Sequence, residues 1–543
     1  MSLNRSLPAV DPSHFAMVPR SDVPRSTFQN ERTYKTTFDT GYLVPIYVDE
    51  VLPGDVHDGS MTVFARLNNL LFPLMDNLEI ETFFFFVPNR IVWANWKKFM
   101  GEQAKPTDSI SYTIPQTVSP ATGFAVGSLF DYFGLPTVGQ VGAGTVSVNS
   151  LPLRAFNLIF NEWFRDENLQ DGLVVPSGDG PDGYGNFNMV KRNKKHDYFT
   201  SCLPWPQKGG VEITLPLGGS AVVKTNATDL FTGSQPAIGY RSTAGASYSV
   251  AHNLAVNASS KGEILSATAT GLGGGFYPSN LYADLSTATG ATINAMRLSI
   301  ATQQFLEKDA RGGTRYTELL KNHFGVTPED ARLQRPEYIG GGRSALQTQA
   351  IPQTSATKIT GSDTAVGSLS GQSVASGSHR FRYHATEHGY IIGLANVAAD
   401  ITYQQGLNRM WSRSTRYDFY WPTFAKLGEQ AVLNKEIFIT GGAADDAVFG
   451  YQERWAEYRY MPSMITGLFK STSAGNIDEW HLSEQFGSLP ALNSTFIQQT
   501  IPASRVLAAG IQANGMQVLF DSVTTLRRTR PVPTYSVPGL LRF

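Results

Sequence analysis

The sequence has little charge and almost no cysteine, and both shortages narrow the class of protein. Its 543 residues include one cysteine, Cys202, which excludes an intrachain disulfide and a metal site built from several cysteines. Charged residues make up 16% and the formal net charge is -1, so the chain alone cannot neutralise a large amount of nucleic acid. A helical repeat protein would contain more Leu, Glu and Lys.

Long apolar runs are also missing. The longest, Phe83–Val87, is far too short to span a bilayer. The first residues, MSLNRSLPAVDPSHF, lack the apolar core of a signal peptide. We therefore expect a protein that is made and used in the cytoplasm and has no membrane partner.

Glycine (51 residues) and proline (30 residues) are abundant instead, and Ser, Thr, Tyr and Phe are frequent, which favours short strands joined by turns and long loops. The run Phe83–Val87 does not alternate, so we expect it to be covered on both faces. The predicted fold is mainly β: an eight-stranded antiparallel jelly roll with long, partly helical loop insertions. Strand texture covers residues 38–48, 61–72, 79–87, 380–397, 411–421, 431–440, 449–461 and 515–526.

Composition divides the chain into five segments. Residues 1–35 and 527–543 are punctuated by proline, carry basic residues and are predicted to be extended arms. Residues 36–214 and 293–526 are predicted to form the two parts of the jelly roll, the second beginning with helices that return the chain. Residues 215–292 are rich in Gly, Ala, Ser and Thr and cannot support a core, so we expect a projecting insertion.

Apolar periodicity predicts helices within the loops. The expected helices cover 91–102, 151–168, a stretch ending near 310, and 314–323, with Gly325 as the C-terminal stop and a short third helix after Thr327. Residues 347–378 are predicted to be a long surface loop, and Gly340–Gly342 a flexible turn that ends the preceding element.

Charge concentrates in residues 301–343, where seven basic residues lie among six acidic ones. Pairs such as Glu307 with Arg311, and Glu318 with Lys321 or Arg315, are spaced for ion pairs on a helix. The segment is therefore predicted to supply contacts between subunits. The candidate residues for these contacts are Arg311, Arg315, Arg332 and Arg335.

Two short basic runs are candidates for contact with DNA phosphates. Aromatic residues lie close to both, so stacking on single-stranded bases is compatible with the pattern. Most short basic runs in proteins simply face the solvent, and this is the alternative interpretation of both runs. The candidate residues are Lys191, Arg192, Lys194, Lys195, Arg527, Arg528 and Arg530.

No catalytic, cofactor-binding or metal-binding residue is predicted. His384 and His388 flank Glu387 in an H-x-x-E-H pattern, but the following residues read as a strand, on which positions four apart lie roughly 13 Å from each other, too far to share one zinc ion. Asp179 and Asp182 lie in a glycine-rich loop and offer oxygen ligands for a structural cation such as calcium. Their spacing, however, does not match a calcium-binding motif. Cys202 is expected to be a buried thiol.

The general alternative is a β-sandwich carbohydrate-binding or carbohydrate-active protein, which the 8 Trp, the 22 Tyr and the many loop acids also suit. Absence of a signal peptide argues against it.

Several long phrases resemble one known family. They include GYLVPIYVDEVLPGD, FFVPNRIVWANWKKFMGE, HDYFTSCLPWPQKG and FGYQERWAEYRYMPS, together with most of residues 306–342 and 386–432. They are similar to the major capsid proteins of microviruses, small tailless bacteriophages with single-stranded DNA, in the gokushovirus branch. The resemblance covers nearly the whole chain outside residues 215–292 and 347–378.

The resemblance implies a virion protein with a jelly-roll fold that assembles with itself in the host bacterial cytoplasm. The shell would be icosahedral, of T=1 type with sixty copies, and would enclose circular single-stranded DNA. Residues 215–292 would project at the threefold axes and take part in host attachment. The implied partners are a small basic packaging protein, a pilot or minor capsid protein and a host surface receptor.

Overall fold

A computed structural model provides the structure, and it describes residues 24–109, 111–210, 213, 293–327, 334–354, 366–508 and 517–535, with six short strands between residues 222 and 284. The chain divides into two compact units. One comprises Met1–Pro206 with Asp309–Phe543, and the other comprises Gln207–Lys308. Each unit is described by itself.

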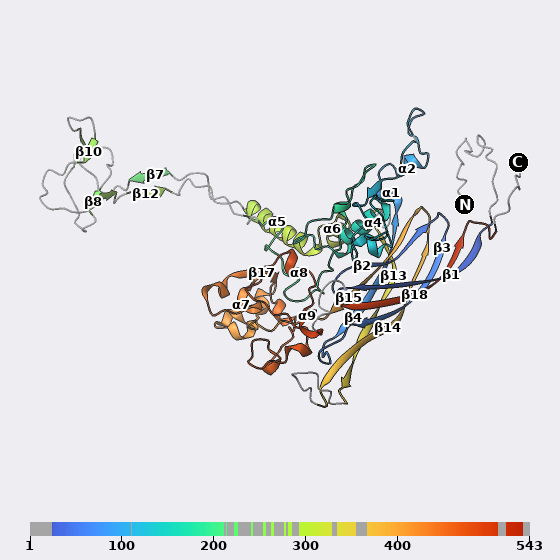
Figure 1. Cartoon of the computed structure of the whole chain (residues 1–543). Helices are drawn as coiled ribbons and strands as arrows, with labels where there is room; N and C mark the ends of the chain where they lie inside the picture. The colour runs from blue at the N-terminus through green and yellow to red at the C-terminus, as the bar shows by residue number, and fades with distance from the viewer. Residues whose placement is uncertain are drawn as a thin grey trace, which may run out of the picture. The chain divides into compact units, whose positions relative to one another are not determined.

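The larger unit is built on one eight-stranded sheet in which every pairing is antiparallel, with the order β1-β18-β3-β14-β13-β4-β15-β2 (Figure 1). This confirms the predicted mainly β, jelly-roll fold. The strands are β1 (Ser26–Phe38), β2 (Val44–Val51), β3 (Val56–Leu67), β4 (Leu78–Pro88), β13 (Glu337–Pro352), β14 (Leu369–His384), β15 (Gly389–Ala399) and β18 (Val518–Arg530).

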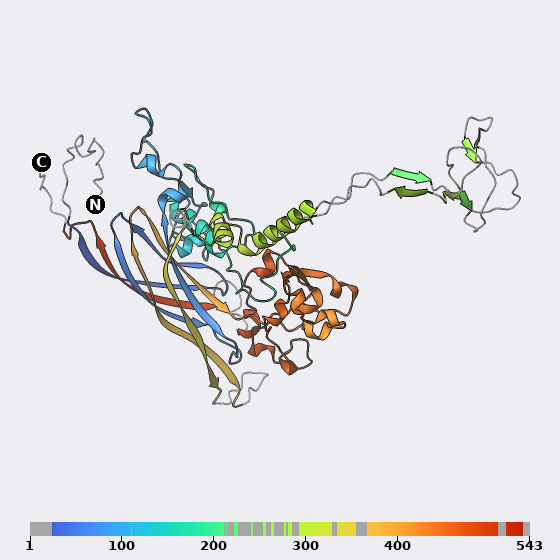
Figure 2. The same cartoon turned by 180° about the vertical axis from the view of Figure 1, so that it is seen from behind.

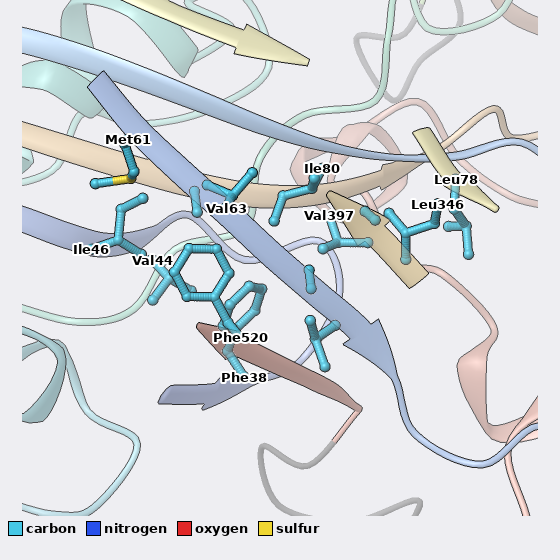
Figure 3. Close-up of a cluster of buried hydrophobic side chains, with 14 of the residues drawn as sticks. Phe38, Val44, Ile46, Met61, Val63, Leu78, Ile80, Leu346, Val397 and Phe520 are labelled. Atoms are coloured by element: carbon cyan, nitrogen blue, oxygen red, sulfur yellow. The ribbon is translucent and has the colours of Figure 1, made fainter. Parts of the chain in front are cut away.

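The main hydrophobic core lies on one face of this sheet. Alternate residues of β3, β4 and β18 point into it and are almost fully buried, and the other strands add fewer buried side chains. Burying each such side chain contributes roughly 1.5–3 kcal/mol, so the strands hold one register. Figure 3 shows this cluster around Phe38, Val44, Ile46, Met61, Val63, Leu78, Ile80, Leu346, Val397 and Phe520.

A second core covers the opposite face of β4 and β15. Phe84 and Phe86 belong to the first core, whereas Phe85 and Val87 belong to the second, so the prediction that Phe83–Val87 is covered on both faces is confirmed. The cover is supplied by loops and by α1 (Asn89–Val92), α3 (Leu129–Tyr132) and α4 (Leu151–Ile159). Figures 1 and 2 show α1 and α4 beside one another.

Two predicted helices differ from the structure. The helix expected over 91–102 is broken into α1 and α2 (Trp96–Phe99), because Trp93 takes an extended conformation and buries its ring. The helix expected over 151–168 ends earlier: α4 is followed by a π-helical turn, Phe160–Phe164. Burial of one large aromatic side chain overrides helix periodicity at the first site.

The predicted arm boundaries are wrong at both ends of the sheet. Residues 26–35 and 527–530 were assigned to the arms, but Ser26 pairs with Arg530 and the two segments form a continuous ladder. β1 is mostly exposed and lacks an apolar period, because its ladder with β18 is formed by backbone groups and by polar side-chain contacts such as Lys35 with Asp521. Its Arg32 donates to the carbonyl of Val48 at 2.9 Å, and so joins the two edge strands β1 and β2.

The surface loop predicted over 347–378 is also wrong in large part. β13 continues to Pro352 and β14 begins at Leu369, and polar side chains such as Thr348 and Ser373 face each other at 2.6 Å. Gly340–Gly342 lie inside β13 rather than in a turn. A Cβ at Gly341 would be 2.2 Å from the carbonyl oxygen of Thr82, so the close approach of two strands requires glycine there.

A third hydrophobic cluster lies under the segment that contains β16 (Glu429–Leu433), β17 (Val448–Glu453), α7 (Asn434–Ile437) and α8 (Ser494–Ile497). The strand predicted over 411–421 is wrong. Three 3₁₀ turns occupy this part, Arg409–Ser412, Arg416–Asp418 and Pro422–Phe424, because side chains such as Asp418 accept local backbone hydrogen bonds and favour turns.

The remaining short elements connect these layers. The helices of the charged segment are α5 (Ile293–Gly312), of which residues up to Lys308 belong to the smaller unit, and α6 (Tyr316–Phe324) of the larger unit; Gly325 ends α6 in a left-handed conformation as predicted. The third helix expected after Thr327 lies outside the described residues. The other short elements of this unit are β5 (Gln116–Val118), β6 (Ser147–Asn149), α9 (Ala503–Val506) and 3₁₀ turns at Tyr184–Asn186, Ala443–Asp446, Ala456–Tyr458, Gly467–Phe469 and Asp478–Trp480.

The smaller unit contains three nested antiparallel pairs, in which the first strand pairs with the last. They are β7 (Val222–Thr225) with β12 (Leu281–Asp284), β8 (Tyr240–Ser242) with β11 (Phe276–Pro278), and β9 (Leu254–Val256) with β10 (Gly262–Ile264). This unit contains the predicted insertion 215–292, whose projection stays a prediction. Among the described helices, none is long and apolar enough to cross a membrane.

Candidate functional site

Two lysines of the first basic run form ion pairs within the chain. Lys194 is buried and its Nζ lies 2.6 Å from Glu484 Oε1. Lys195 Nζ lies 3.1 Å from Glu79 Oε2 and 2.8 Å from Asp400 Oδ1. These contacts join the run to β4 and to the segment after β15, so both cations have a structural role.

Lys191 and Arg192 differ in burial. Lys191 donates to the hydroxyl of Thr500 at 3.1 Å and is only half-buried. Arg192 pairs with the fully buried carboxylate of Glu81, which Arg343 also approaches at 3.0 Å. Burial is the main cause that lowers the pKa of Arg192 to about 10, so this guanidinium stays charged at neutral pH.

An aromatic cavity of about 360 Å³ opens beside this run. Arg192 lies 5.1 Å from the ring of Phe83, and Arg335 lies 4.4 Å from the ring of Trp163. The rings offer flat faces for stacking, but the cations that line the cavity, Arg192, Lys194 and Lys195, are each paired with a carboxylate of the same chain. Besides the basic run, the cavity is lined by Phe83, Phe85, Trp163, Phe164 and Tyr338.

The second basic run, at the end of β18, is divided between structure and surface. Arg528 lies 3.0 Å from Asp49, and Arg530 lies 3.0 Å from the buried Asp55. Both contacts reach from β18 towards β2 and so stabilise the edge of the sheet. Arg527 is exposed, and no ion pair to it is present among the described residues.

A row of exposed arginines, not predicted from the sequence, lies on the face of the sheet opposite the main core. By register Arg527 and Arg382 flank Asp58 on neighbouring strands, and Arg380 and Arg66 share their exposed face. The available signal was the alternation in β14, where buried residues separate exposed Arg380 and Arg382. This row is the more accessible phosphate-binding candidate.

The arginine predicted to contact a neighbouring subunit at 311 is engaged within its own chain. Arg311 Nε donates to Glu429 Oε1 at 2.9 Å, and its Nη1 donates to the carbonyl of Ser201 at 3.2 Å. The expected pairing with Glu307 is replaced by this contact with β16. A role between subunits stays a prediction for this residue.

Arg315 and Arg335 also have intrachain partners. Arg315 lies 3.0 Å from Glu318, which confirms that predicted pair, and 3.5 Å from Glu162. Arg335 donates to the carbonyl oxygen of Glu162 at 3.0 Å. Arg332 lies outside the described residues. Both described arginines tie the charged segment to the loop after α4, and their predicted contacts with other subunits are untested.

The histidines of the H-x-x-E-H pattern lie on a turn between strands. His384 is the last residue of β14 and His388 precedes β15, while Glu387 accepts a hydrogen bond from Arg90 Nε at 2.7 Å. Across the described residues, no group of three His, Cys, Asp or Glu side chains could hold a metal ion. The pattern is therefore the polar entry to a buried strand.

The two loop aspartates bind protein donors. Asp182 is buried and forms a two-point ion pair with Arg154, at 2.7 and 2.8 Å. Asp179 accepts hydrogen bonds from Asn95 and from Trp93 Nε1, and these, Asn95 first, lower the pKa of its carboxyl. Both carboxylates fix the loop over the second core.

Cys202 is buried in the third cluster, as predicted. Its Sγ donates to the carbonyl of Tyr198 at 3.3 Å, and burial raises the pKa of the thiol far above its usual value. A thiol that stays protonated is a poor nucleophile.

Comparison with known proteins gives one consistent result over nearly the whole chain. A family model described as "Capsid protein (F protein)" matches residues 16–540. The chain is 44% identical to capsid protein VP1 of Bdellovibrio phage phiMH2K, over 97% of each chain. It is 41% identical to capsid protein VP1 of Chlamydia phage 1, over all of both chains, and 36% identical to that of Spiroplasma virus 4, over 97% of each.

Proposed function

The chain belongs to the phage capsid protein (F protein) family, and on that premise we propose that it forms a T=1 icosahedral shell of sixty copies around a circular single-stranded DNA genome. Membership makes it a structural protein of the virion that assembles with itself, and not an enzyme. The carbohydrate-active alternative is therefore dropped.

The observation that carries the proposal is the agreement between the family match and the fold. The match spans residues 16–540, and the larger unit is an eight-stranded jelly roll whose strands come from both ends of the chain. A jelly roll is one of the architectures that viral shells use. Assembly in the host bacterial cytoplasm is part of the proposal.

The test is assembly of the purified full chain. We expect particles of uniform size by negative-stain imaging and sedimentation velocity. A stable monomer under every assembly condition tried would overturn the proposal.

The charge distribution supports a separate neutralising partner. Most cations of the two basic runs are paired with carboxylates of the same chain, and the net charge is -1. Enclosed DNA would therefore need counterions from elsewhere, such as a small basic packaging protein. A pilot or minor capsid protein is a further partner that we propose on family grounds.

We propose that the exposed row on the sheet, Arg380, Arg382 and Arg527, contacts the enclosed DNA. Replacing all three by Gln should lower the DNA content of particles more than their yield. Lys35→Gln is the control, since Lys35 also carries one positive charge on the sheet but already lies 3.0 Å from Asp521. Unchanged DNA content in the triple variant would remove this face from the proposal.

For residues 215–292 we propose attachment to a host surface receptor. Deletion of 220–288 should leave the jelly roll folded and abolish adsorption to the host cell. If the deletion instead unfolds the larger unit, as judged by circular dichroism, the segment belongs to the core and the proposal fails.

A further inference from the structure

The segment between β15 and α8 exposes an unusual number of large apolar side chains. Trp411 is 70% exposed, Met464 74% and Met461 98%, and Phe419, Tyr420 and Trp421 are each about half exposed. Monomeric soluble proteins rarely expose contiguous apolar patches of this kind. These six residues and Tyr458 are called the aromatic surface below.

Ring contacts join part of this surface, and Glu457, which lines the neighbouring cavity, connects to it through Arg413 at 3.3 Å. Arg413 lies over the rings of Phe419 and Tyr458, at 5.4 and 4.4 Å from their centres. Tyr420 packs against Tyr458 at 6.3 Å. Trp411 and Met464 line one cavity of about 220 Å³. A ridge of rings therefore borders a hollow, which is the usual form of an interface hot spot.

The charge of this segment argues against nucleic acid as the partner. Residues 404–470 contain eight Lys or Arg and seven Asp or Glu, so they carry almost no excess positive charge. Several of the cations are also paired locally: Arg409 lies 3.1 Å from Glu436, and Arg413 lies 3.3 Å from Glu457. Binding to phosphates needs unpaired cations in excess.

The composition instead fits contact with protein. Trp, Tyr, Met and Arg are the residue types enriched at the core of protein interfaces, where charged groups are few or paired. Methionine side chains also adapt to the shape of an apolar partner but offer no face on which bases stack. Because the chain assembles with itself, other copies are the partner that this family guarantees to be present.

We propose that the aromatic surface docks against a second copy of this chain in the assembled shell, an inference that rests on the proposed function. In an icosahedral shell the facing surface is the same patch of the neighbouring copy across a twofold axis, and a different part of it around a threefold or fivefold axis. The cavity beside Trp411 accepts an apolar side chain of that copy.

The first test compares a double variant in the aromatic surface with a control variant at an exposed ring elsewhere. Trp411→Ser with Phe419→Ser should leave the subunit folded and raise the concentration needed for assembly at least tenfold in sedimentation velocity. Tyr184→Ser is the matched control, because Tyr184 and Phe419 are both 52% exposed and Tyr184 lies far from this segment in sequence. The control variant should assemble like the unaltered chain.

The outcomes separate the two proposals. If the unaltered chain assembles and the double variant assembles equally well, this inference is overturned and the shell function stands. If the unaltered chain does not assemble, the shell function fails and takes this inference with it. If particles form normally but hold less DNA, the surface contacts nucleic acid and the inference is wrong.

A second measurement needs no altered subunit. Met461 and Met464 should be oxidised by hydrogen peroxide at least tenfold more slowly in particles than in free subunits, as followed by peptide mass spectrometry. Met61, which is fully buried in the sheet, reports on folding and should resist oxidation in both forms. Equal rates for Met461 and Met464 in the two forms would overturn the proposal.

Discussion

Two aromatic runs of the same length differ in burial in this protein. Phe83–Val87 lies in β4, where successive side chains enter two cores, whereas Tyr417–Trp421 lies on 3₁₀ turns with its rings largely exposed. The difference comes from their neighbours, since Asp418 and Pro422 favour turns and leave no strand to pair. Aromatic content therefore indicates burial somewhere, either within the subunit or against another molecule.

Removal of an aromatic ring should destabilise the subunit much more in Phe83–Val87 than in Tyr417–Trp421. Phe84→Ala removes a fully buried ring and should reduce the free energy of unfolding by about 3–5 kcal/mol, whereas Tyr420→Ala should change it by less than about 0.5 kcal/mol. Urea unfolding of the unassembled subunit measures both. A large loss of stability from Tyr420→Ala would show that this ring supports the fold and would weaken the contrast.

Loss of a buried ion pair should likewise destabilise the subunit more than loss of an exposed one. Asp182→Asn leaves the fully buried Arg154 guanidinium without its carboxylate and should cost about 3–5 kcal/mol. Glu453→Gln removes the exposed partner of Arg459 beside the aromatic surface and should cost less than about 1 kcal/mol. Urea unfolding curves of the two variants and the parent measure both losses of stability. Equal losses would contradict the expected difference between buried and exposed ion pairs.

Close strand packing should give a smaller effect. Gly341→Ala places a Cβ 2.2 Å from a backbone oxygen that cannot move freely, so a loss of about 1–3 kcal/mol is expected. Gly185→Ala is the control, because a Cβ there meets nothing within 4 Å. Thermal unfolding of both variants tests the pair. A neutral Gly341→Ala would mean that the β4–β13 approach can widen.

The smallest effect concerns acid. Burial lowers the pKa of His57 and of His379 within the sheet, so the unfolded chain binds protons more readily than the folded one. Their contribution to stability is thus present above pH about 6.5 and is lost as the pH falls below it. His379→Gln should flatten the decline in thermal midpoint between neutral pH and pH about 5.

The sequence predicted those parts of the molecule in which local pattern and burial agree. The position of β4, the double cover of Phe83–Val87 and the stop at Gly325 follow from alternation and glycine chemistry. The strands expected over 38–48 and 61–72 overlap β2 and β3, but their predicted bounds are displaced by several residues. β1 and the outer halves of β13 and β14 could not be predicted this way, because their ladders are formed by backbone groups while their side chains remain polar and exposed.

The candidate site was harder to predict for a similar reason. Lys194, Lys195 and Arg528 look like free cations in the sequence, but their carboxylate partners lie on segments far away along the chain. Local charge thus overstates what is available to a ligand. The exposed arginine row needs strand register to become visible, since Arg382 and Arg527 are 145 positions apart and meet only across Asp58.

The pairing of β1 with β18 has a consequence for the order of events during synthesis. Among the described strands of the sheet, β1 pairs only with β18, which is formed by Val518–Arg530, far along the chain from Ser26–Phe38. Contacts so distant in sequence form late and slowly. A nascent chain therefore cannot complete this edge of its sheet before Val518–Arg530 have been made, so products truncated before them lack the finished edge and are poor building blocks for a shell.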